Sequence, residues 1–346
     1  MRAVRYLSFG APLELVDVPD PHPPADGVVV KVEATGLCLS DWHGWMGHDQ
    51  DVHPPHIPGH EFAGTVVDAG SSVRSWKAGD RVTAPFSLGC GQCEQCRAGQ
   101  SQICDRYYQP GFTGPGSFAE YVALPYADDN LVALPPGIGF VSAALLGCRF
   151  ATAYRAVTAQ GRLQPGEWIA VHACGGVGLS AVMIAHALGG RVVAVDVADE
   201  KLALARRLGA DATVNAARTG DVPGAIHDLT AGGAHVSLDA LGSVATCVNS
   251  IASLRKRGRH VQIGLMMGEH SRPPIPMGPV IARELEIRGS HGVAARDYPE
   301  LLALIAGGRL APEQLLRRTI PLSEAPAALP RMAAFEGAGV TVIDRF

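Results

Sequence analysis

A short strand that runs into a glycine-rich turn and then a helix constrains this chain more than any other feature. The apolar run Trp168–His172 predicts a buried strand, and Leu179–Leu188 has the length and composition of a helix. Turn glycines let a backbone approach a pyrophosphate, and a helix N-terminus offers free N–H groups to its charge. We therefore expect a dinucleotide site at the intervening residues, Gly175, Gly176, Val177 and Gly178.

An acidic residue follows this turn at the distance that a dinucleotide site requires. Asp196 ends the next predicted strand, Arg191–Asp196, 18 residues after Gly178. Its carboxylate is expected to accept hydrogen bonds from the adenosine ribose. A 2′-phosphate there would meet a like charge, at a cost of up to ~4 kcal/mol at ~4 Å and an effective dielectric of ~20. NAD is therefore favoured over NADP, and the alternative is a structural turn with Asp196 as a surface cap.

One position departs from the usual G-x-G-x-x-G pattern. Ala173 stands where the first glycine would be. A methyl group fits there if the residue keeps a negative φ, so we expect only a modest weakening of the motif.

The N-terminal part of the chain has the pattern of an all-β domain. Its apolar runs are short, separated by Gly, Pro and Asp turns, and no strong helix pattern joins them. Such a pattern is typical of a barrel-like domain. The runs are Val28–Val32, Gly64–Val67, Arg81–Thr83 and Ala119–Val122.

From about residue 143 the pattern changes to helix-length segments that alternate with strands. Alternation of this kind predicts a parallel doubly wound sheet, and 346 residues exceed the size at which one core usually stops growing. The helix-length segments include Ala143–Ala159 and Tyr298–Ala306, and a final strand at Val340–Ile343 could rejoin the first domain. The further strands are expected at His235–Leu238, Arg259–Gly264 and Glu286–Gly289.

Charge and hydropathy exclude several classes of partner. A net charge of −4 and a pI near 6.3 argue against nucleic acid and anionic membranes. Arg149 interrupts the longest apolar stretch, Val141–Val157, so no membrane span is predicted. The N-terminal residues Met1–Tyr6 lack an apolar signal core, and we expect a cytoplasmic protein.

Four of the eight cysteines lie within 15 residues of one another, in a glycine-rich loop. Four thiolates close a tetrahedron around zinc and leave no position for a substrate. The loop therefore predicts a structural zinc, with disulfides or unligated core thiols as the alternatives. The four are Cys90, Cys93, Cys96 and Cys104.

A second metal site is expected near the stretch 38–70. A catalytic zinc usually takes three protein ligands and keeps one position open. Cys38 and His60 are first-rate ligands there, and Glu61 adds a carboxylate. Cys148 is the best candidate for the third ligand, although a lone cysteine among apolar residues is more often part of a core.

Together these motifs resemble the zinc-dependent alcohol dehydrogenases of the medium-chain dehydrogenase/reductase superfamily, over essentially the whole chain. The resemblance rests on the cysteine loop, on Gly59-His60-Glu61 with Gly64 and Gly70, and on the glycine turn with Asp196. It implies an α/β protein in which a GroES-like β domain, 1–145, is completed by 290–346. A Rossmann NAD-binding domain would occupy 146–289.

The resemblance also implies roles around the catalytic zinc. Cys38, His60 and Cys148 resemble its three ligands. Glu61 resembles the acid that lies behind the metal and can approach it transiently. Asp41 resembles the carboxylate that orients the ligating histidine.

Proton transfer and substrate contacts are assigned in the same way. Ser40 resembles the hydroxyl that bonds the substrate oxygen, and His43 the outer base of a proton relay joined to it through the cofactor ribose. Phe86 falls where relatives often place an aromatic residue of the substrate pocket. Trp42 and Trp45 are expected either to line that pocket or to belong to the core.

Further residues are expected near the cofactor. Lys201 resembles a cation close to the adenosine ribose, and Ile263 and Gly264 end a strand of the nucleotide sheet. Two departures predict weaker cofactor binding. Leu39 replaces a basic residue of several relatives, and Val340-Thr341-Val342 lacks an arginine that some use.

The implied function is hydride transfer between a small alcohol and NAD, giving an aldehyde or ketone, with two zinc ions per subunit in a homo-oligomeric enzyme, a tetramer or a dimer. The runner-up is a polyol or sugar-alcohol dehydrogenase, in which a glutamate commonly replaces the third thiolate. A zinc hydrolase would not need Asp196 and its sheet. A structural NAD-binding protein would lose the relay that Ser40 and His43 represent.

Overall fold

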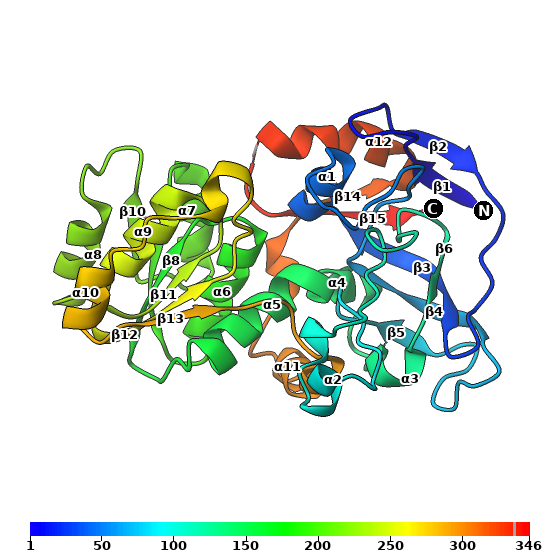
Figure 1. The fold of residues 1–346 in the computed structure, drawn as a ribbon, viewed down its shortest axis with the longest axis horizontal. Helices are drawn as coiled ribbons and strands as arrows, with labels where there is room; N and C mark the ends of the chain where they lie inside the picture. The colour runs from blue at the N-terminus through cyan, green and yellow to red at the C-terminus, as the bar shows by residue number, and fades with distance from the viewer. Residues whose placement is uncertain (335–336) are drawn as a thin grey trace. The chain divides into compact units, whose positions relative to one another are not determined.

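The computed structural model describes residues 1–334 and 337–346, and it divides into two compact units (Figure 1). Unit 1 comprises Met1–Ala151, the described residues that follow from Gly292 to 334, and Val340–Phe346. Unit 2 comprises Thr152–His291 and Gly337–Gly339. Within the described residues, every helix is too short or too polar to cross a membrane.

Unit 2 contains a six-stranded parallel sheet with the order β10-β9-β8-β11-β12-β13. The strand order changes direction next to β8, and this switch point is where doubly wound sheets bind ligands. The predicted parallel sheet is therefore confirmed. The strands are β8 (Trp168–His172), β9 (Arg191–Asp196), β10 (Ala212–Asn215), β11 (Ala234–Asp239), β12 (Leu254–Gln262) and β13 (Glu286–Gly289).

Helices separate these strands along the chain and pack on the sheet (Figure 1). The first of them, α6, begins at Gly176 and not at Leu179, because Gly175 already takes the extended N-cap conformation. The glycine turn is thus shorter than the sequence suggested. The helices of this unit are α6 (Gly176–Ala187), α7 (Asp199–Arg207), α8 (Val222–Thr230), α9 (Val244–Ala252) and α10 (Met277–Ala282).

Unit 1 is built on a seven-stranded sheet, which confirms the predicted β domain. Its order is β14-β15-β3-β4-β5-β7, and β6 also pairs with β3. A separate antiparallel pair is formed by β1 and β2. The strands are β1 (Arg2–Arg5), β2 (Glu14–Asp17), β3 (Val28–Gly36), β4 (Phe62–Ala69), β5 (Arg81–Thr83), β6 (Tyr121–Leu124), β7 (Val132–Ala133), β14 (Leu316–Pro321) and β15 (Val340–Arg345).

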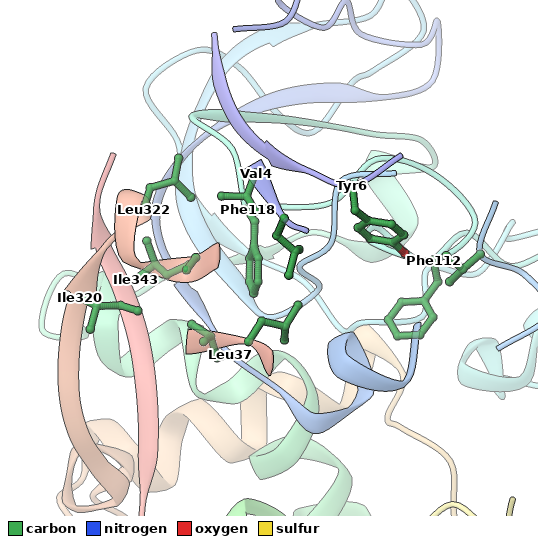
Figure 2. Packing of buried hydrophobic residues seen from close by; sticks show 12 residues of the cluster. Val4, Tyr6, Leu37, Phe112, Phe118, Ile320, Leu322 and Ile343 are labelled. Atoms are coloured by element: carbon green, nitrogen blue, oxygen red, sulfur yellow. The ribbon is translucent and has the colours of Figure 1, made fainter. Parts of the chain in front are cut away.

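The end of β3 is held by the last strand of the chain. In β15, Val342 pairs with Gly36, and the Leu37 N–H donates to the Thr341 carbonyl at 3.0 Å. Leu37 is buried in an apolar cluster that draws side chains from the first, middle and last parts of the chain (Figure 2). Packing from three distant segments thus positions the residue that follows Leu37, which is Cys38.

The segment expected as one helix over Ala143–Ala159 is helical, but two π-helical turns interrupt its α-helix. The elements α4 (Phe140–Ala144) and α5 (Ala151–Arg155) alternate with two π-helical turns, η2 (Leu146–Phe150) and η3 (Ala156–Gln160). Such wider turns are frequent at functional sites, and apolar periodicity does not distinguish them from α-helix. Cys148 lies in η2.

The remaining α-helices of unit 1 are short, except α11. The predicted helix Tyr298–Ala306 is confirmed as α11. The others are α1 (Leu39–Trp45), α2 (Glu94–Arg97), α3 (Ala127–Asn130) and α12 (Ala325–Ala328).

Candidate functional site

Four potential metal ligands that are far apart in sequence meet in unit 1. One ligand atom from each of Cys38, His60, Glu61 and Cys148 lies within 4.8 Å of all the others. Cys38 caps the start of α1, His60 and Glu61 directly precede β4, and Cys148 comes from η2. The group has the donor types of a zinc site.

A buried carboxylate orients two of these ligands. Asp41 Oδ1 accepts hydrogen bonds from His60 Nδ1 at 2.8 Å and from the Gly59 N–H at 3.0 Å, while Oδ2 accepts from the Cys38 N–H at 3.0 Å. His60 Nδ1 is therefore the protonated nitrogen. His60 Nε2 is buried and has no hydrogen-bond partner among the described residues. A lone pair left in this way among sulfur donors fits a metal ion.

The pKa values of the two thiols in the group are shifted in opposite directions. A hydrogen bond from the Cys148 thiol holds the pKa of Cys38 well below its usual value, and the same bond raises the pKa of Cys148. Burial by itself lowers the pKa of His60, but the Asp41 carboxylate outweighs it and the pKa lies well above its usual value. A metal ion must displace these protons, so binding is expected to release protons.

The fourth member of the group has a partner that sequence reasoning missed. Burial raises the pKa of Glu61 to about 7, although the Arg149 guanidinium opposes this shift. Arg149 is itself buried and forms an ion pair with Glu61. The signal was present in the sequence, because a single arginine inside a long apolar stretch needs a buried anion.

The proposed relay residues lie on α1 beside the metal cluster. Ser40 and His43 are three residues apart, which places them on one face of the helix. Ser40 Oγ lies 3.7 Å from Cys38 Sγ. His43 Nδ1 lies 2.9 Å from Nδ1 of His48, which the sequence suggests only as a residue that lines the substrate cleft. Burial lowers the pKa of His43, and the neighbouring His48 adds to this effect.

Aromatic side chains border the same region. The ring of Phe86 is perpendicular to that of His60 with a centroid distance of 6.3 Å, and the Phe86 N–H donates to the Gly147 carbonyl at 2.9 Å. Trp42 makes edge contacts with His43. Trp45 donates from Nε1 to the Ala11 carbonyl at 2.7 Å and packs against the apolar cluster of unit 1, as a core residue does.

The four loop cysteines form a second, separate group. One sulfur from each lies within 4.8 Å of the others. The Cys104 sulfur accepts N–H donors from Cys90 and Arg106, both at 3.2 Å. Burial alone would raise the pKa of Cys90, but backbone N–H groups outweigh it and bring the pKa to about 6. Burial instead raises the pKa of Cys96 to about 12 and also raises the pKa of Cys104. Four sulfurs this close together fit a closed zinc site.

In unit 2 the glycine turn closes tightly onto the end of β8. A Cβ at Gly178 would overlap the carbonyl oxygen of Ala173, so only glycine fits there. Asp196 is buried, and its Oδ2 accepts from the Cys174 N–H at 2.7 Å while Oδ1 accepts from the Ala198 N–H at 3.0 Å. Asp196 therefore joins the two loops that follow β8 and β9 and is not a surface cap.

The other expected cofactor residues lie on the same unit. The N–H groups of Ile263 and Gly264 both donate to the Asp239 carbonyl, at 3.0 and 2.8 Å, where β11 and β12 end. A Cβ at Gly264 would overlap the Gly242 nitrogen. Lys201 lies in the first turn of α7. Carboxyl ends of parallel strands share one edge of a sheet, so these residues lie at the edge that carries the glycine turn.

Ala173 does not have the negative φ that an alanine would need to fit this turn without strain. Its φ is +72°, in the left-handed region, where a Cβ is strained. The strain is of order 1–2 kcal/mol for an L-residue other than glycine. The turn keeps the conformation that a glycine would adopt because Gly178 and the Asp196 hydrogen bonds hold the surrounding backbone.

Replacing Ala173 by glycine is therefore expected to stabilise the protein. Glycine removes the strain of the left-handed conformation in the folded state, but it also gives the unfolded chain more conformational entropy. The first free-energy term exceeds the second by about 1 kcal/mol. Urea unfolding should show a higher midpoint. The matched control is Ala203→Gly, at an exposed position in the middle of helix α7, which should lower the free energy of unfolding by about 1 kcal/mol. Equal losses in both variants would show that Ala173 is unstrained.

Two domain-family models match the chain. The zinc-binding dehydrogenase model matches residues 176–307. The alcohol dehydrogenase GroES-like domain model matches residues 24–136. The first match begins inside the glycine turn and covers most of the parallel sheet. The second covers most of the β domain with Cys38, His60 and the four loop cysteines, and Cys148 lies between the two matches.

Individual proteins resemble the chain over nearly its full length. An alcohol dehydrogenase of Geobacillus stearothermophilus is 34% identical over 335 residues, which are 96% of this chain and 95% of that protein. An NAD-dependent alcohol dehydrogenase of Sulfurisphaera tokodaii is 33% identical and covers 99% of each chain. The solved structure of a cobalt- and zinc-bound thermostable alcohol dehydrogenase from Pyrobaculum aerophilum superimposes with a TM-score of 0.85, at 29% identity and 99% coverage of each chain.

Proposed function

The chain belongs to the zinc-binding alcohol dehydrogenases of the medium-chain superfamily, and from this premise we propose that it interconverts an alcohol and its aldehyde or ketone with NAD and zinc. One zinc would be held by Cys38, His60 and Cys148. A second, structural zinc would be held by the four loop cysteines. The domain assignment, 1–145 with 290–346 for catalysis and 146–289 for NAD, is part of the proposal.

One observation carries the proposal. His60 presents a buried, unpartnered Nε2 to two cysteine sulfurs while Asp41 holds its other nitrogen. Carboxylates that do not touch the metal orient histidine ligands by accepting from the other ring nitrogen. Burial of the His60 ring costs free energy unless Nε2 also binds a partner. Three protein ligands leave one position of a tetrahedral zinc open for an exchangeable ligand.

When bound, zinc would supply a Lewis acid that polarises the alcohol or carbonyl oxygen, and NAD would supply the hydride acceptor. The chain's own residues then have to receive the alcohol proton. Ser40 has its oxygen next to the Cys38 sulfur and so lies beside the metal cluster. We assign to it the hydrogen bond with the substrate oxygen.

His43 is assigned the outer position of the proton path. Its pKa is lowered by burial and by His48, so the ring stays neutral near pH 7 and can accept a proton. The hydrogen bond with the exposed His48 offers the proton a way to solvent. A link between Ser40 and His43 through a cofactor hydroxyl stays a prediction from the family resemblance.

Replacement of His43 by alanine is expected to lower kcat by about 10²-fold, the lower end of the range for a general base. The native rate should fall as the pH drops through the lowered pKa of His43, below about 6.5, because the protonated ring cannot accept a proton. In the variant this acid limb should disappear, and added imidazole should restore part of the rate. His53→Ala, in an exposed loop position, is the control. An unchanged pH profile would contradict the relay.

Unit 2 is proposed to hold NAD at the edge of its sheet. The first N–H groups of α6 have no acceptors within the helix, which suits a pyrophosphate. Asp196 supplies a carboxylate at the end of β9. The close approach of Gly264 to Gly242 and of Gly178 to Ala173 supports a tight backbone cradle.

The proposed reaction is tested by the initial rate of NAD reduction over primary, secondary, aromatic and polyol substrates, with and without a metal chelator. Chelator-sensitive turnover of simple alcohols is the expected result. Turnover confined to polyols would favour the runner-up function. No NADH binding would favour a zinc hydrolase, and NADH binding without turnover would favour a structural role.

A further inference from the structure

Arg149 is placed unusually for an arginine. Among the residues that the structure describes, it is the only lysine or arginine that is buried, with 7% of its surface exposed. It directly follows the metal-ligand candidate Cys148 and lies in the same π-helical turn. Burial of a guanidinium costs several kcal/mol unless the charge is paired and hydrogen-bonded. Its partners should therefore show what the charge is for.

All the partners of Arg149 belong to the metal cluster or to the strand that leads to it. Nη2 donates to Glu61 Oε2, and the backbone N–H of Arg149 reaches Glu61 Oε1 at 3.3 Å. Nη1 donates to the Leu37 carbonyl at 2.9 Å. One residue thus engages both oxygens of the Glu61 carboxylate and also holds the backbone before Cys38.

The surrounding backbone packs closely against this ion pair. A Cβ at Gly36 would overlap Glu61 Oε2 and would lie 2.7 Å from Arg149 Nη2. The Gly36 N–H also donates to the Glu61 carbonyl at 2.7 Å. A Cβ at Gly147 would lie 3.2 Å from the Glu61 Cα. The carboxylate is therefore enclosed between β3 and η2.

The charges of the cluster explain why a cation is needed behind it. Cys38 and Cys148 as thiolates, together with Asp41 and Glu61, would carry four negative charges. A divalent metal ion neutralises two of them. Without a buried cation, the Glu61 carboxylate would be drawn to the metal as a further ligand, because its oxygen already lies within 4.8 Å of the other ligand atoms.

We propose that Arg149 is a positioning residue that holds Glu61 beside the metal and not on it, so that the fourth coordination position stays open to a small ligand. The inference rests on the proposed function, since it presumes a metal at Cys38, His60 and Cys148. It adds that Arg149 decides whether this site is open, with three protein ligands, or closed, with four.

The test uses the full-length protein with cobalt in place of zinc and neutral imidazole as the small ligand. Imidazole binding is followed by the change in the visible cobalt spectrum at pH 8. Imidazole is neutral at this pH, so loss of the Arg149 charge does not itself attract or repel it. Arg149→Met should weaken imidazole binding by about tenfold or more, because Glu61 then occupies the open position. The double variant with Glu61→Gln should return the affinity to that of the native protein.

Two further variants keep the test decisive if Arg149→Met does not fold. Glu61→Gln alone retains an acceptor for Arg149 and should leave the imidazole affinity unchanged, since native Glu61 is already off the metal. Arg2→Met removes an exposed ion pair with Glu120 in the same unit and should change nothing. Tighter imidazole binding in Glu61→Gln, or native affinity in Arg149→Met, would overturn the inference.

The cobalt spectrum of the native protein separates failure of the proposed function from failure of the role given to Arg149. The native protein would then show no thiolate-to-cobalt absorption that depends on Cys148, and the inference would fall with it. If that absorption is present and Arg149→Met still binds imidazole as the native protein does, only the role of Arg149 is wrong.

Discussion

Cys148→Ser is expected to remove one of two zinc ions and to abolish measurable alcohol oxidation. A serine hydroxyl is a poor zinc ligand at neutral pH, and the two remaining protein ligands, Cys38 and His60, hold zinc weakly. Loss of the Lewis acid should cost about 4 kcal/mol or more in the barrier, which is at least a thousandfold in kcat. Metal analysis and initial rates on the same samples measure both effects.

The controls separate this effect from general damage. Cys247→Ala changes a buried cysteine of unit 2 that lies outside both metal groups found among the described residues, and it should keep two zinc ions and nearly full activity. Circular dichroism should show that Cys148→Ser keeps its secondary structure. Two zinc ions and native rates in Cys148→Ser would show that Cys148 is a core thiol.

Asp196→Asn is expected to shift the cofactor preference strongly towards NADPH. Removing the like charge near a 2′-phosphate relieves up to ~4 kcal/mol at ~4 Å and an effective dielectric of ~20, or up to about a thousandfold in the NADPH to NADH affinity ratio. Fluorescence titrations with both nucleotides measure this ratio. The asparagine keeps one acceptor oxygen for the Cys174 or Ala198 N–H, so the loop should stay in place.

Asp199→Asn is the matched control for the cofactor prediction. Asp199 begins α7 three residues further on and is exposed. Its replacement changes the net charge equally but should leave the ratio of the two affinities within about threefold of the native value, because screening weakens exposed charges. Native-like discrimination in Asp196→Asn would mean that another group selects the cofactor.

Five of the six strands in the sheet of unit 2 could be predicted from the sequence, whereas β10 was missed. The strands Trp168–His172, Arg191–Asp196 and Glu286–Gly289 are confirmed to the residue. The first two are fully or almost fully buried apolar runs, which stand out against polar helix faces. The strand expected over Arg259–Gly264 was harder, because β12 begins at Leu254 with charged residues on its exposed part.

The composition of the candidate metal groups could also be predicted, but not what holds them in place. Residue type and spacing indicate a ligand, since thiolates and imidazole are rare in such combinations. The hydrogen bond between Cys38 and Cys148 and the pairing of His43 with His48 depend on the tertiary structure, which no spacing rule supplies. The site roles, the oligomeric state and the cytoplasmic location stay predictions.

At Arg149 and Ala173 the structure differs from what the local sequence suggests. Arg149 excludes a membrane span because it is a charge inside an apolar stretch, and the same charge in a buried segment also demands a counter-ion, which is Glu61. Ala173 was expected to avoid the left-handed region, although the turn around it imposes that conformation. In both cases tertiary structure overrides the local preference of the residue.

The central claim is that zinc at the Cys38, His60 and Cys148 site is required for turnover. The most direct measurement removes zinc stepwise with a chelator and determines zinc per chain and NAD-dependent alcohol oxidation in the same samples. The account predicts that activity disappears as zinc per chain falls from two to one, and returns when zinc is added back. Full activity in protein with no zinc at this site would contradict it.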